Sequence, residues 1–177
     1  MYFAVEFLPT KTDLKYFDYT FEEIPEDIDR YLELRENEVS GLRDNSKKQI
    51  VWANGKKKTP ISILYIHGFS SSKQEIRPVP DLVAKHFDAN LFFTRLAGHG
   101  QSSGKMLEVS VSDWIYDLIE ALEIGKRIGN KTIIIATSTG ATLVTAVLAN
   151  APADLKDSIL GVIFISPNFG IKHFSAP

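Results

Sequence analysis

The amino-acid sequence predicts an α/β fold, in which helices cover both faces of a doubly wound, mostly parallel sheet. Short runs of β-branched and aromatic residues alternate with longer helical segments, which is the pattern of this fold class. The runs are apolar throughout rather than alternating, as in strands that are covered on both faces. No internal repeat or low-complexity segment interrupts the pattern. The predicted strands lie at residues 61–66, 91–94, 132–136 and 159–165.

Three helical segments are predicted to connect these strands. In the first, residues 80–87, one face carries Leu82, Val83, His86 and Phe87. The second follows an S-x-x-D sequence at residues 110–113, which is typical of a capping box. Its predicted core-facing residues are Ile115, Leu118, Ile119 and Leu122, and its predicted solvent-facing residues are Asp117, Glu120 and Glu123. The third, residues 140–149, is apolar nearly all round, so we expect it to be buried.

The first 60 residues are more charged and less regular. Pro25 opens a predicted short helix, because its missing N–H costs nothing in a first helical turn. Residues 39–42 and 49–53 flank a turn-rich sequence and are predicted to pair as an antiparallel hairpin. The lysines at 56–58 are predicted to form an exposed loop. We expect a single, incomplete domain over residues 1–177, with an N-terminal extension at 1–37, a core at 38–170 and a tail at 171–177.

Composition and charge exclude several classes of function. Twenty Lys and Arg against 22 Asp and Glu leave a net charge of -2, which argues against nucleic-acid binding through a basic face. The absence of cysteine excludes disulfides, thiolate zinc sites, iron–sulfur clusters and a cysteine nucleophile. The four histidines are far apart in the sequence and lack paired carboxylates, so no metal site is expected. Without a signal peptide or an apolar run that could span a bilayer, we expect a cytoplasmic protein.

The strongest signal for chemistry is an apolar strand that runs into Ser138 and then directly into a helix. Ala136 and Gly140 stand two residues on either side of Ser138, close to the G-x-S-x-G pattern of a nucleophile elbow, with alanine in place of the first glycine. Small neighbours let strand and helix approach, and the helix N-terminus offers N–H groups to an oxyanion. The simpler interpretation is that Ser138 and Thr139 only cap the helix.

The loop after the strand 61–66 supplies a second candidate element, with the sequence HGFSSS. In a serine hydrolase the oxyanion hole takes one N–H from the residue after the nucleophile and one from such a loop, roles that Thr139 and Phe69 fit. Gly68 would let the backbone approach a substrate carbonyl. We interpret His67 as a residue that shapes this loop rather than as a general base, because its place beside the oxyanion hole is poor for taking the serine proton.

A third element is the glycine-rich sequence at residues 94–104. Its glycines are spaced G-x-G-x-x-x-G, which departs from the dinucleotide-binding fingerprint, and no apolar helix opens after them. A glycine-rich turn ordered by His99 is therefore the better interpretation, and a nucleotide-binding protein is disfavoured.

HGFSSS after one strand, GHGQSSG after the next and TST after a third, in this order, resemble the α/β-hydrolase superfamily. The likeness is greatest to carboxylesterase, monoacylglycerol-lipase and lysophospholipase-like serine hydrolases, and it covers about residues 40–170. It implies that Ser138 is the nucleophile and that Phe69 and Thr139 supply the oxyanion N–H groups. It also implies hydrolysis of a small acyl ester, thioester or amide without a cofactor.

The remaining triad members are not evident in the sequence. In this superfamily an acid and then a histidine follow the nucleophile, on loops after later strands. Asp154, Asp157 and His173 follow Ser138 in that order, but both aspartates precede the last predicted strand and His173 stands close to the chain end. We therefore expect the acid and the histidine beyond this chain, which would be the N-terminal portion of a hydrolase and nearly inactive by itself. An exposed sheet edge at the last strand would favour association of two copies.

Two hypotheses from different classes follow. The first is a serine hydrolase that forms an acyl-enzyme on Ser138. The alternative is a non-catalytic α/β-hydrolase-like protein that binds a small apolar ligand, with Ser138 as a polar contact only.

Overall fold

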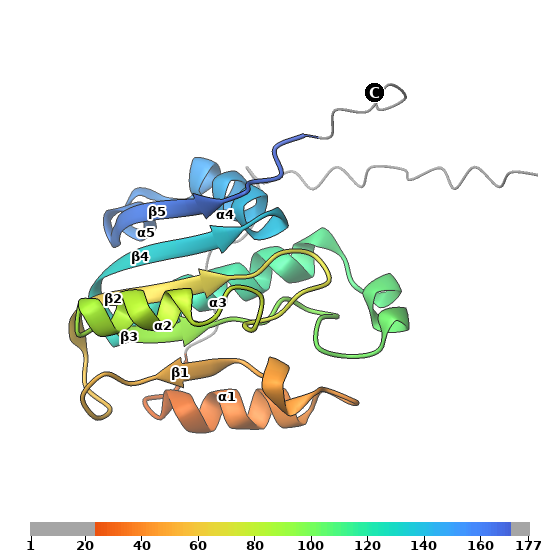
Figure 1. The fold of residues 1–177 in the computed structure, drawn as a ribbon, viewed down its shortest axis with the longest axis horizontal. Helices are drawn as coiled ribbons and strands as arrows, with labels where there is room; N and C mark the ends of the chain where they lie inside the picture. Colours follow the sequence, from red (N-terminus) through yellow and green to blue (C-terminus); the bar gives the residue numbers. More distant parts are fainter. Residues whose placement is uncertain (1–23, 171–177) are drawn as a thin grey trace, which may run out of the picture.

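The computed structural model describes residues 24–170 and contains a five-stranded sheet with the strand order β1-β3-β2-β4-β5 (Figure 1). Strands β2 to β5 run parallel, and β1 pairs antiparallel with β3 at one edge. The strands are β1 (Gln49–Val51), β2 (Thr59–Ile66), β3 (Asn90–Phe93), β4 (Gly129–Thr137) and β5 (Ile159–Ile165).

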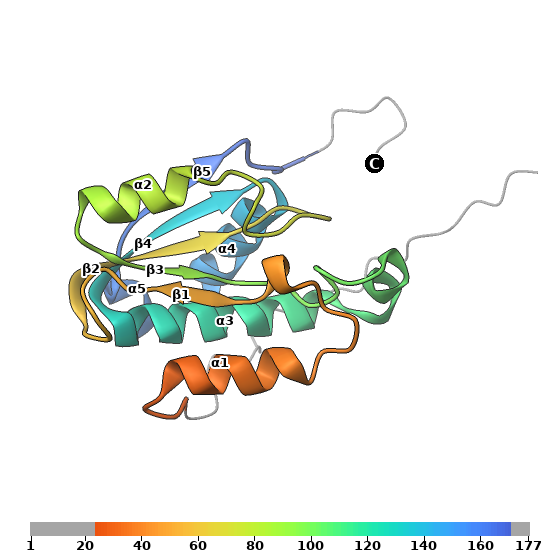
Figure 2. The same ribbon diagram turned by 60° about the horizontal axis from the view of Figure 1, so that its bottom comes forward.

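Helices cover both faces of this sheet. Helix α2 lies on one face, and α3 and α4 lie on the other, as the two ribbon views show (Figures 1 and 2). Helix α1 packs near β1 on the same side as α3. The helices are α1 (Ile28–Asn37), α2 (Val79–His86), α3 (Val111–Ile128), α4 (Thr139–Asn150) and α5 (Ala153–Asp157), with 3₁₀ segments η2 (Asp44–Ser46) and η3 (Ser103–Glu108). Within residues 24–170, no helix combines the length and apolar character needed to span a bilayer.

The predicted doubly wound, mostly parallel α/β sheet is confirmed. The central strand β2 shows why its apolar run is continuous. Ile63 and Tyr65 pack in the cluster beneath α2, whereas Leu64 and Ile66 pack in the cluster shared with α3 and α4. Because successive side chains point to opposite faces and both faces are covered, each position must be apolar.

The predicted hairpin at the N-terminal side of the core is wrong in its pairing. Residues 39–42 form no strand, and 49–51 pair antiparallel with β3 instead. Gln49 lies opposite Phe93, so the antiparallel partner comes from about 40 residues later in the chain. The turn-rich sequence between the two segments forms η2, which cannot close a hairpin. The lysines at 56–58 are exposed in a loop, as predicted.

Two helices also differ from the prediction. Helix α1 begins after Asp27, whose carboxylate accepts the backbone N–H of Arg30, so Asp27 rather than Pro25 marks its start. In α2 the predicted core face holds only for Val83, which packs against the cluster beneath the helix, whereas Leu82, His86 and Phe87 are exposed. The small residue Ala84, outside the predicted face, is the buried residue that packs there beside Val83.

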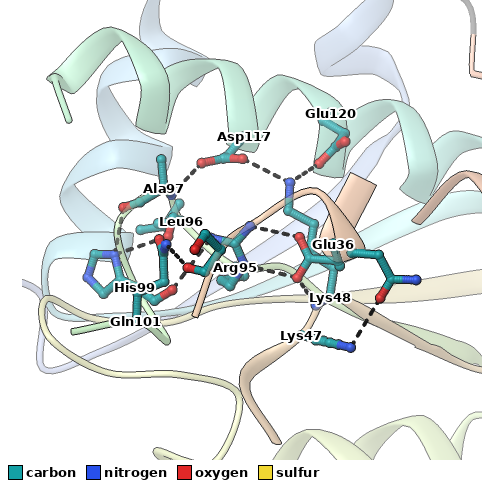
Figure 3. Close-up of polar contacts among 12 residues, drawn as sticks. Glu36, Lys47, Lys48, Arg95, Leu96, Ala97, His99, Gln101, Asp117 and Glu120 are labelled. Atoms are coloured by element: carbon teal, nitrogen blue, oxygen red, sulfur yellow. Dashed lines mark hydrogen bonds and ion pairs between the residues drawn. The ribbon is translucent and has the colours of Figure 1, made fainter. Parts of the chain in front are cut away.

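Helix α3 has the predicted capping box at its start, but two of its predicted solvent-facing residues are buried. Glu120 is buried and the side chain of Asp117 is largely so. Both face Lys48, whose ammonium group pairs with the two carboxylates (Figure 3). Helical periodicity places these acids on the polar stripe, but the segment between η2 and β1 covers that stripe and supplies a cation.

This contact belongs to a buried ion cluster that we define as Glu36, Lys48, Arg95, Asp117 and Glu120 (Figure 3). The guanidinium of Arg95 donates to both oxygens of Glu36, at 2.7 and 2.9 Å, a bidentate geometry. Burial alone would raise the pKa of Glu36, but the hydrogen bond and charge of Arg95 lower it below its usual range. Burial would likewise lower the pKa of Lys48, yet its two carboxylate partners raise it.

The ion cluster also holds the glycine-rich loop after β3. Asp117 Oδ2 accepts the backbone N–H of Ala97 at 2.6 Å, and Arg95 approaches the carbonyl of His99 at 3.5 Å. The N-terminal helix, the segment before β1 and helix α3 therefore converge on one loop. This loop lies next to the candidate site described below.

At the opposite edge of the sheet, the two faces of β5 are less covered than predicted. Strand β5 has mostly partly exposed or exposed side chains within residues 24–170, including Leu160, Ile163 and Phe164. Helix α4 is buried along only one side, whereas the prediction had it buried nearly all round. The apolar surface at this edge is therefore unpaired in the part of the chain that the structure describes.

We predict that Lys48→Met destabilises the protein by about 3–5 kcal/mol, because it leaves two buried carboxylates without their cation. Lys56→Met is the matched control, since the ammonium of Lys56 pairs with Asp29 at the surface and its loss should change little. Denaturant unfolding of both variants measures the difference. Equal stability of the two variants would show that the cluster does not stabilise the fold.

Candidate active site

The backbone turns sharply at Ser138, the single residue between β4 and α4. Its φ of 48° and ψ of -116° lie in a region that residues with a side chain rarely adopt. The Ser138 N–H donates to the carbonyl of Ile165 at 3.0 Å, so strand β5 holds the turn from one side. The side chain makes no capping hydrogen bond to α4, which does not support the interpretation of Ser138 as a helix cap. Such strained geometry is typical of a functional position.

Gly140 allows the start of α4 to lie against the end of β2. A Cβ atom at this position would lie 2.6 Å from the carbonyl oxygen of His67 and 2.7 Å from that of Ile66. Both contacts are with backbone atoms, which cannot move aside cheaply. The requirement for a small residue two positions after the serine therefore has a steric cause in this structure.

The loop after β2 lies beside the turn. In the parallel register Ile66 pairs with Ala136, so the two strands end at the same level and the next residues are neighbours. A Cβ atom on Gly68 would lie 3.3 Å from Ser138 Cβ, which shows how closely the loop passes the serine. The predicted nucleophile and the predicted oxyanion loop are thus brought together.

Three successive peptide groups of this loop are fixed by side chains. The N–H of Gly68 donates to Glu75 Oε2 at 2.9 Å, and the carbonyl of Gly68 accepts from His67 Nδ1 at 2.8 Å. The N–H of Ser70 donates to His99 Nε2 at 3.0 Å. Because the Gly68 carbonyl and the Phe69 N–H belong to the same planar peptide, the contact with His67 also sets the direction of that N–H.

Both histidines at the site are committed to such contacts. His67 Nε2 accepts the backbone N–H of Leu96 at 3.1 Å, so its single proton lies on Nδ1. Burial lowers the pKa of His67 to about 3 and also lowers the pKa of His99. His67 therefore has no nitrogen free to accept a proton from Ser138 in this arrangement.

An aromatic cluster supports the loop from the side of α3. The exposed ring of Phe69 contacts His99 and Trp114 edge-on, with centroid distances of 6.0 and 6.2 Å. The rings of His67 and His99 lie 4.8 Å apart. Beside this cluster is an apolar hollow of about 190 Å³, next to the N-terminus of α4. It is lined by Val111, Trp114, Thr139, Thr142, Leu143 and Ala146.

Strand connectivity explains why the site forms here. After β2 the chain passes to α2 on one face of the sheet, whereas after the neighbouring β4 it passes to α4 on the other face. Adjacent strands whose connections leave in opposite directions open a crevice at their carboxyl ends. Ser138 and Phe69 lie at this switch point.

Other residues weighed in the sequence do not reach this crevice. Asp154 and Asp157 belong to α5, which precedes β5 and lies at the opposite end of the strands. His173 lies outside the described residues. Within residues 24–170 the structure therefore places no aspartate of α5 near Ser138, and no group of three His, Asp or Glu residues could hold a metal ion.

Sequence reasoning missed Glu75. Its Oε2 atom accepts both the Gly68 N–H, at 2.9 Å, and the phenol of Tyr65, at 2.7 Å. Glu75 lies in an irregular stretch between β2 and α2, and no periodicity or motif marks it. Only the fold brings its carboxylate to the loop.

Comparison with known proteins gives a consistent result. The profile of the family described as "Serine aminopeptidase, S33" matches residues 58–177. One similar solved structure comes from work on LipS and LipT, two metagenome-derived lipolytic enzymes, with 20% identity and a TM-score of 0.61 over 77% of this chain and 55% of that chain. Another is Est1E from Butyrivibrio proteoclasticus with bound ferulic acid, with 21% identity and a TM-score of 0.53 over 70% of this chain and 50% of that chain.

No curated protein matched the chain in sequence. The chain spans about half the length of the solved structures that it matches, and at identities near 20% the likeness is one of fold.

We predict that Gly140→Ala destabilises the protein by about 3 kcal/mol, because the added methyl group would press on the backbone carbonyls at the end of β2. Gly161→Ala in β5 is the matched control, since no atom lies within 4 Å of a Cβ atom there. Thermal or denaturant unfolding gives both values. A Gly140→Ala protein as stable as the Gly161→Ala protein would contradict the steric argument.

A second prediction concerns pH. His67 has a folded-state pKa of about 3, below the unfolded value, so the unfolded chain binds more protons between pH 3 and pH 6.5. The contribution of neutral His67 to stability is present in full above about pH 6.5 and decreases as the pH falls, by about 2 kcal/mol between pH 7 and pH 5. Unfolding measured at both pH values, with His67→Gln for comparison, isolates this contribution.

The control for this experiment is His86→Gln, because His86 lies on an exposed position of α2. We expect this variant to lose as much stability as the wild type between pH 7 and pH 5. His67→Gln should be less stable at pH 7 but less sensitive to acid. The same acid sensitivity in His67→Gln and wild type would mean that His67 is not the group responsible.

Proposed function

Since the chain belongs to the serine aminopeptidase S33 family of the α/β-hydrolase superfamily, we propose that it carries the nucleophile and oxyanion hole of a serine hydrolase. The observation that supports this most directly is the strained backbone at Ser138, next to a loop fixed by side-chain contacts. The Ser138 side chain makes no capping hydrogen bond to α4, so capping does not account for this conformation.

In the proposed reaction Ser138 Oγ attacks the carbonyl carbon of an ester while a base takes its proton. The carbonyl oxygen becomes an oxyanion and accepts hydrogen bonds from the N–H groups of Phe69 and Thr139. Expulsion of the alcohol, which takes up the proton, leaves an acyl group on Ser138, and water releases it in the second half-reaction. The described residues thus stabilise charge and supply the nucleophile.

The base and its partner acid are proposed to come from parts of the protein other than residues 24–170. His67 and His99 are committed to backbone groups, and His86 lies in α2, so none of the described histidines fits the role. The complete protein is then the active species, with this chain alone retaining only the catalysis of an oxyanion hole.

An acyl ester with an apolar group suits the surroundings of Ser138. The apolar hollow begins at Thr139, one residue from the nucleophile, and Phe69 and Trp114 border the same region. Burial of an apolar group there would contribute about 25 cal/mol for each Å² of surface removed from water. We therefore propose a carboxylic ester, rather than a charged peptide, as the substrate class.

We predict that a fluorophosphonate probe labels Ser138 in the complete protein and that Ser138→Ala abolishes labelling and reduces ester hydrolysis by about 10⁴-fold or more. Mass spectrometry of the labelled peptide identifies the site. Ser112→Ala is a matched control, since Ser112 is an exposed serine in the first turn of α3. Binding of an apolar ester without labelling or turnover would favour the non-catalytic alternative.

A further inference from the structure

We propose that Glu75 is a positioning residue for the oxyanion loop, which it holds through Gly68 and Tyr65. This inference rests on the proposed function, because it assigns a role in the same site. The supporting contacts join Glu75, in the segment before α2, to Tyr65 near the end of β2 and to Gly68 in the loop after it.

A single oxygen of Glu75 links two parts of the site. Oε2 accepts the Gly68 N–H at 2.9 Å and the Tyr65 hydroxyl at 2.7 Å. The Tyr65 hydroxyl lies 3.2 Å from Oγ1 of Thr137, the residue before Ser138. One carboxylate thus connects the loop after β2 with the end of β4, on which the nucleophile stands.

Tyr65 is a rigid anchor for this link. Its side chain is fully buried, and its ring packs edge-on against Phe93 at 5.9 Å. Burial and the neighbouring Glu75 raise the pKa of Tyr65, so its hydroxyl keeps its proton and remains a donor. The buried Tyr65 hydroxyl therefore holds the carboxylate of Glu75, although Glu75 itself is an exposed residue.

The contact with Gly68 constrains the peptide next to the proposed donor. Glu75 fixes the peptide group that carries the Gly68 N–H, and His67 fixes the following one, which carries the Phe69 N–H. A Cβ atom on Gly68 would lie 2.9 Å from Glu75 Oε1 and 3.3 Å from Ser138 Cβ. The carboxylate of Glu75 therefore meets the loop at the residue where the loop passes closest to the serine.

If Glu75 only positions the loop, its loss should weaken stabilisation of the transition state and leave substrate binding nearly unchanged. In the complete protein, we expect Glu75→Ala to lower kcat for p-nitrophenyl butyrate by about 10- to 100-fold, with KM changed less than about twofold, since losing an oxyanion donor outright costs about 10²–10³ in kcat. The affinity for a trifluoromethyl ketone, which forms an oxyanion with the serine, should fall by the same factor as kcat/KM.

The variant Glu75→Gln separates the effect of the carboxylate's charge from the effect of its hydrogen bonds. Its carbonyl oxygen can accept both hydrogen bonds now made to Oε2, whereas its charge is lost, so it should recover most of the activity that Glu75→Ala loses. Glu108→Gln is the matched control, because Glu108 is exposed and pairs only with Lys105 among its described contacts. This control should match the wild type in kcat, KM and inhibitor affinity.

The outcomes distinguish this inference from the proposed function. Wild-type kcat in Glu75→Ala, with Ser138 still labelled by fluorophosphonate, would overturn the role of Glu75 and leave the proposed function intact. A parallel loss of kcat and rise in KM that Glu75→Gln does not recover would also overturn it. Absence of labelling in the wild type, with activity retained in Ser138→Ala, would reject the proposed function itself.

A second variant covers the case in which Glu75→Ala does not fold, as judged by its thermal unfolding. Tyr65→Phe removes one of the two donors to Glu75 Oε2 and leaves the Gly68 contact in place. We expect kcat to fall by about 2- to 5-fold at constant KM. This loss is smaller than the effect of removing an oxyanion donor, because Glu75 still accepts the Gly68 N–H. Unchanged kcat in a folded Tyr65→Phe protein would overturn the inference.

Discussion

The close packing of the first turn of α4 against the end of β2 is the constraint on which the site depends. Gly140 makes it possible, because any side chain there would overlap two backbone carbonyl groups. With α4 held so near to β2, the chain has a single residue in which to reverse direction, and Ser138 takes up the resulting strain. The positive φ of the serine is thus a consequence of packing between elements rather than of local preference.

The loop after β2, which we propose as the oxyanion loop, shows how polar contacts give precision to a segment without regular structure. Loops are usually the more mobile parts of a domain, and a catalytic donor must keep its direction within narrow limits. Here Glu75, His67 and His99 each hold one peptide group in succession. The two histidines are buried and neutral, so they serve as fixed hydrogen-bonding groups instead of proton carriers.

The buried ion cluster extends this support to the N-terminal part of the chain. Arg95 joins α1 through Glu36, and Asp117 joins α3 to the loop after β3. That loop contains His99, which in turn accepts the N–H of Ser70. Buried ion pairs contribute little net stability compared with apolar packing, but they fix a unique arrangement because an unpaired member is costly. We infer that the cluster mainly sets the register between α1, α3 and the loop.

The sequence by itself determined the strands, the capping box of α3 and the small residues around Ser138, because these features depend on local pattern and on side-chain size. Only the tertiary structure decided which strand pairs with 49–51, which acids of α3 are buried and that Glu75 reaches Gly68. These are contacts between residues distant in the sequence or placed in irregular loops. Neither periodicity nor a motif records them, since they depend on which elements the completed sheet brings together.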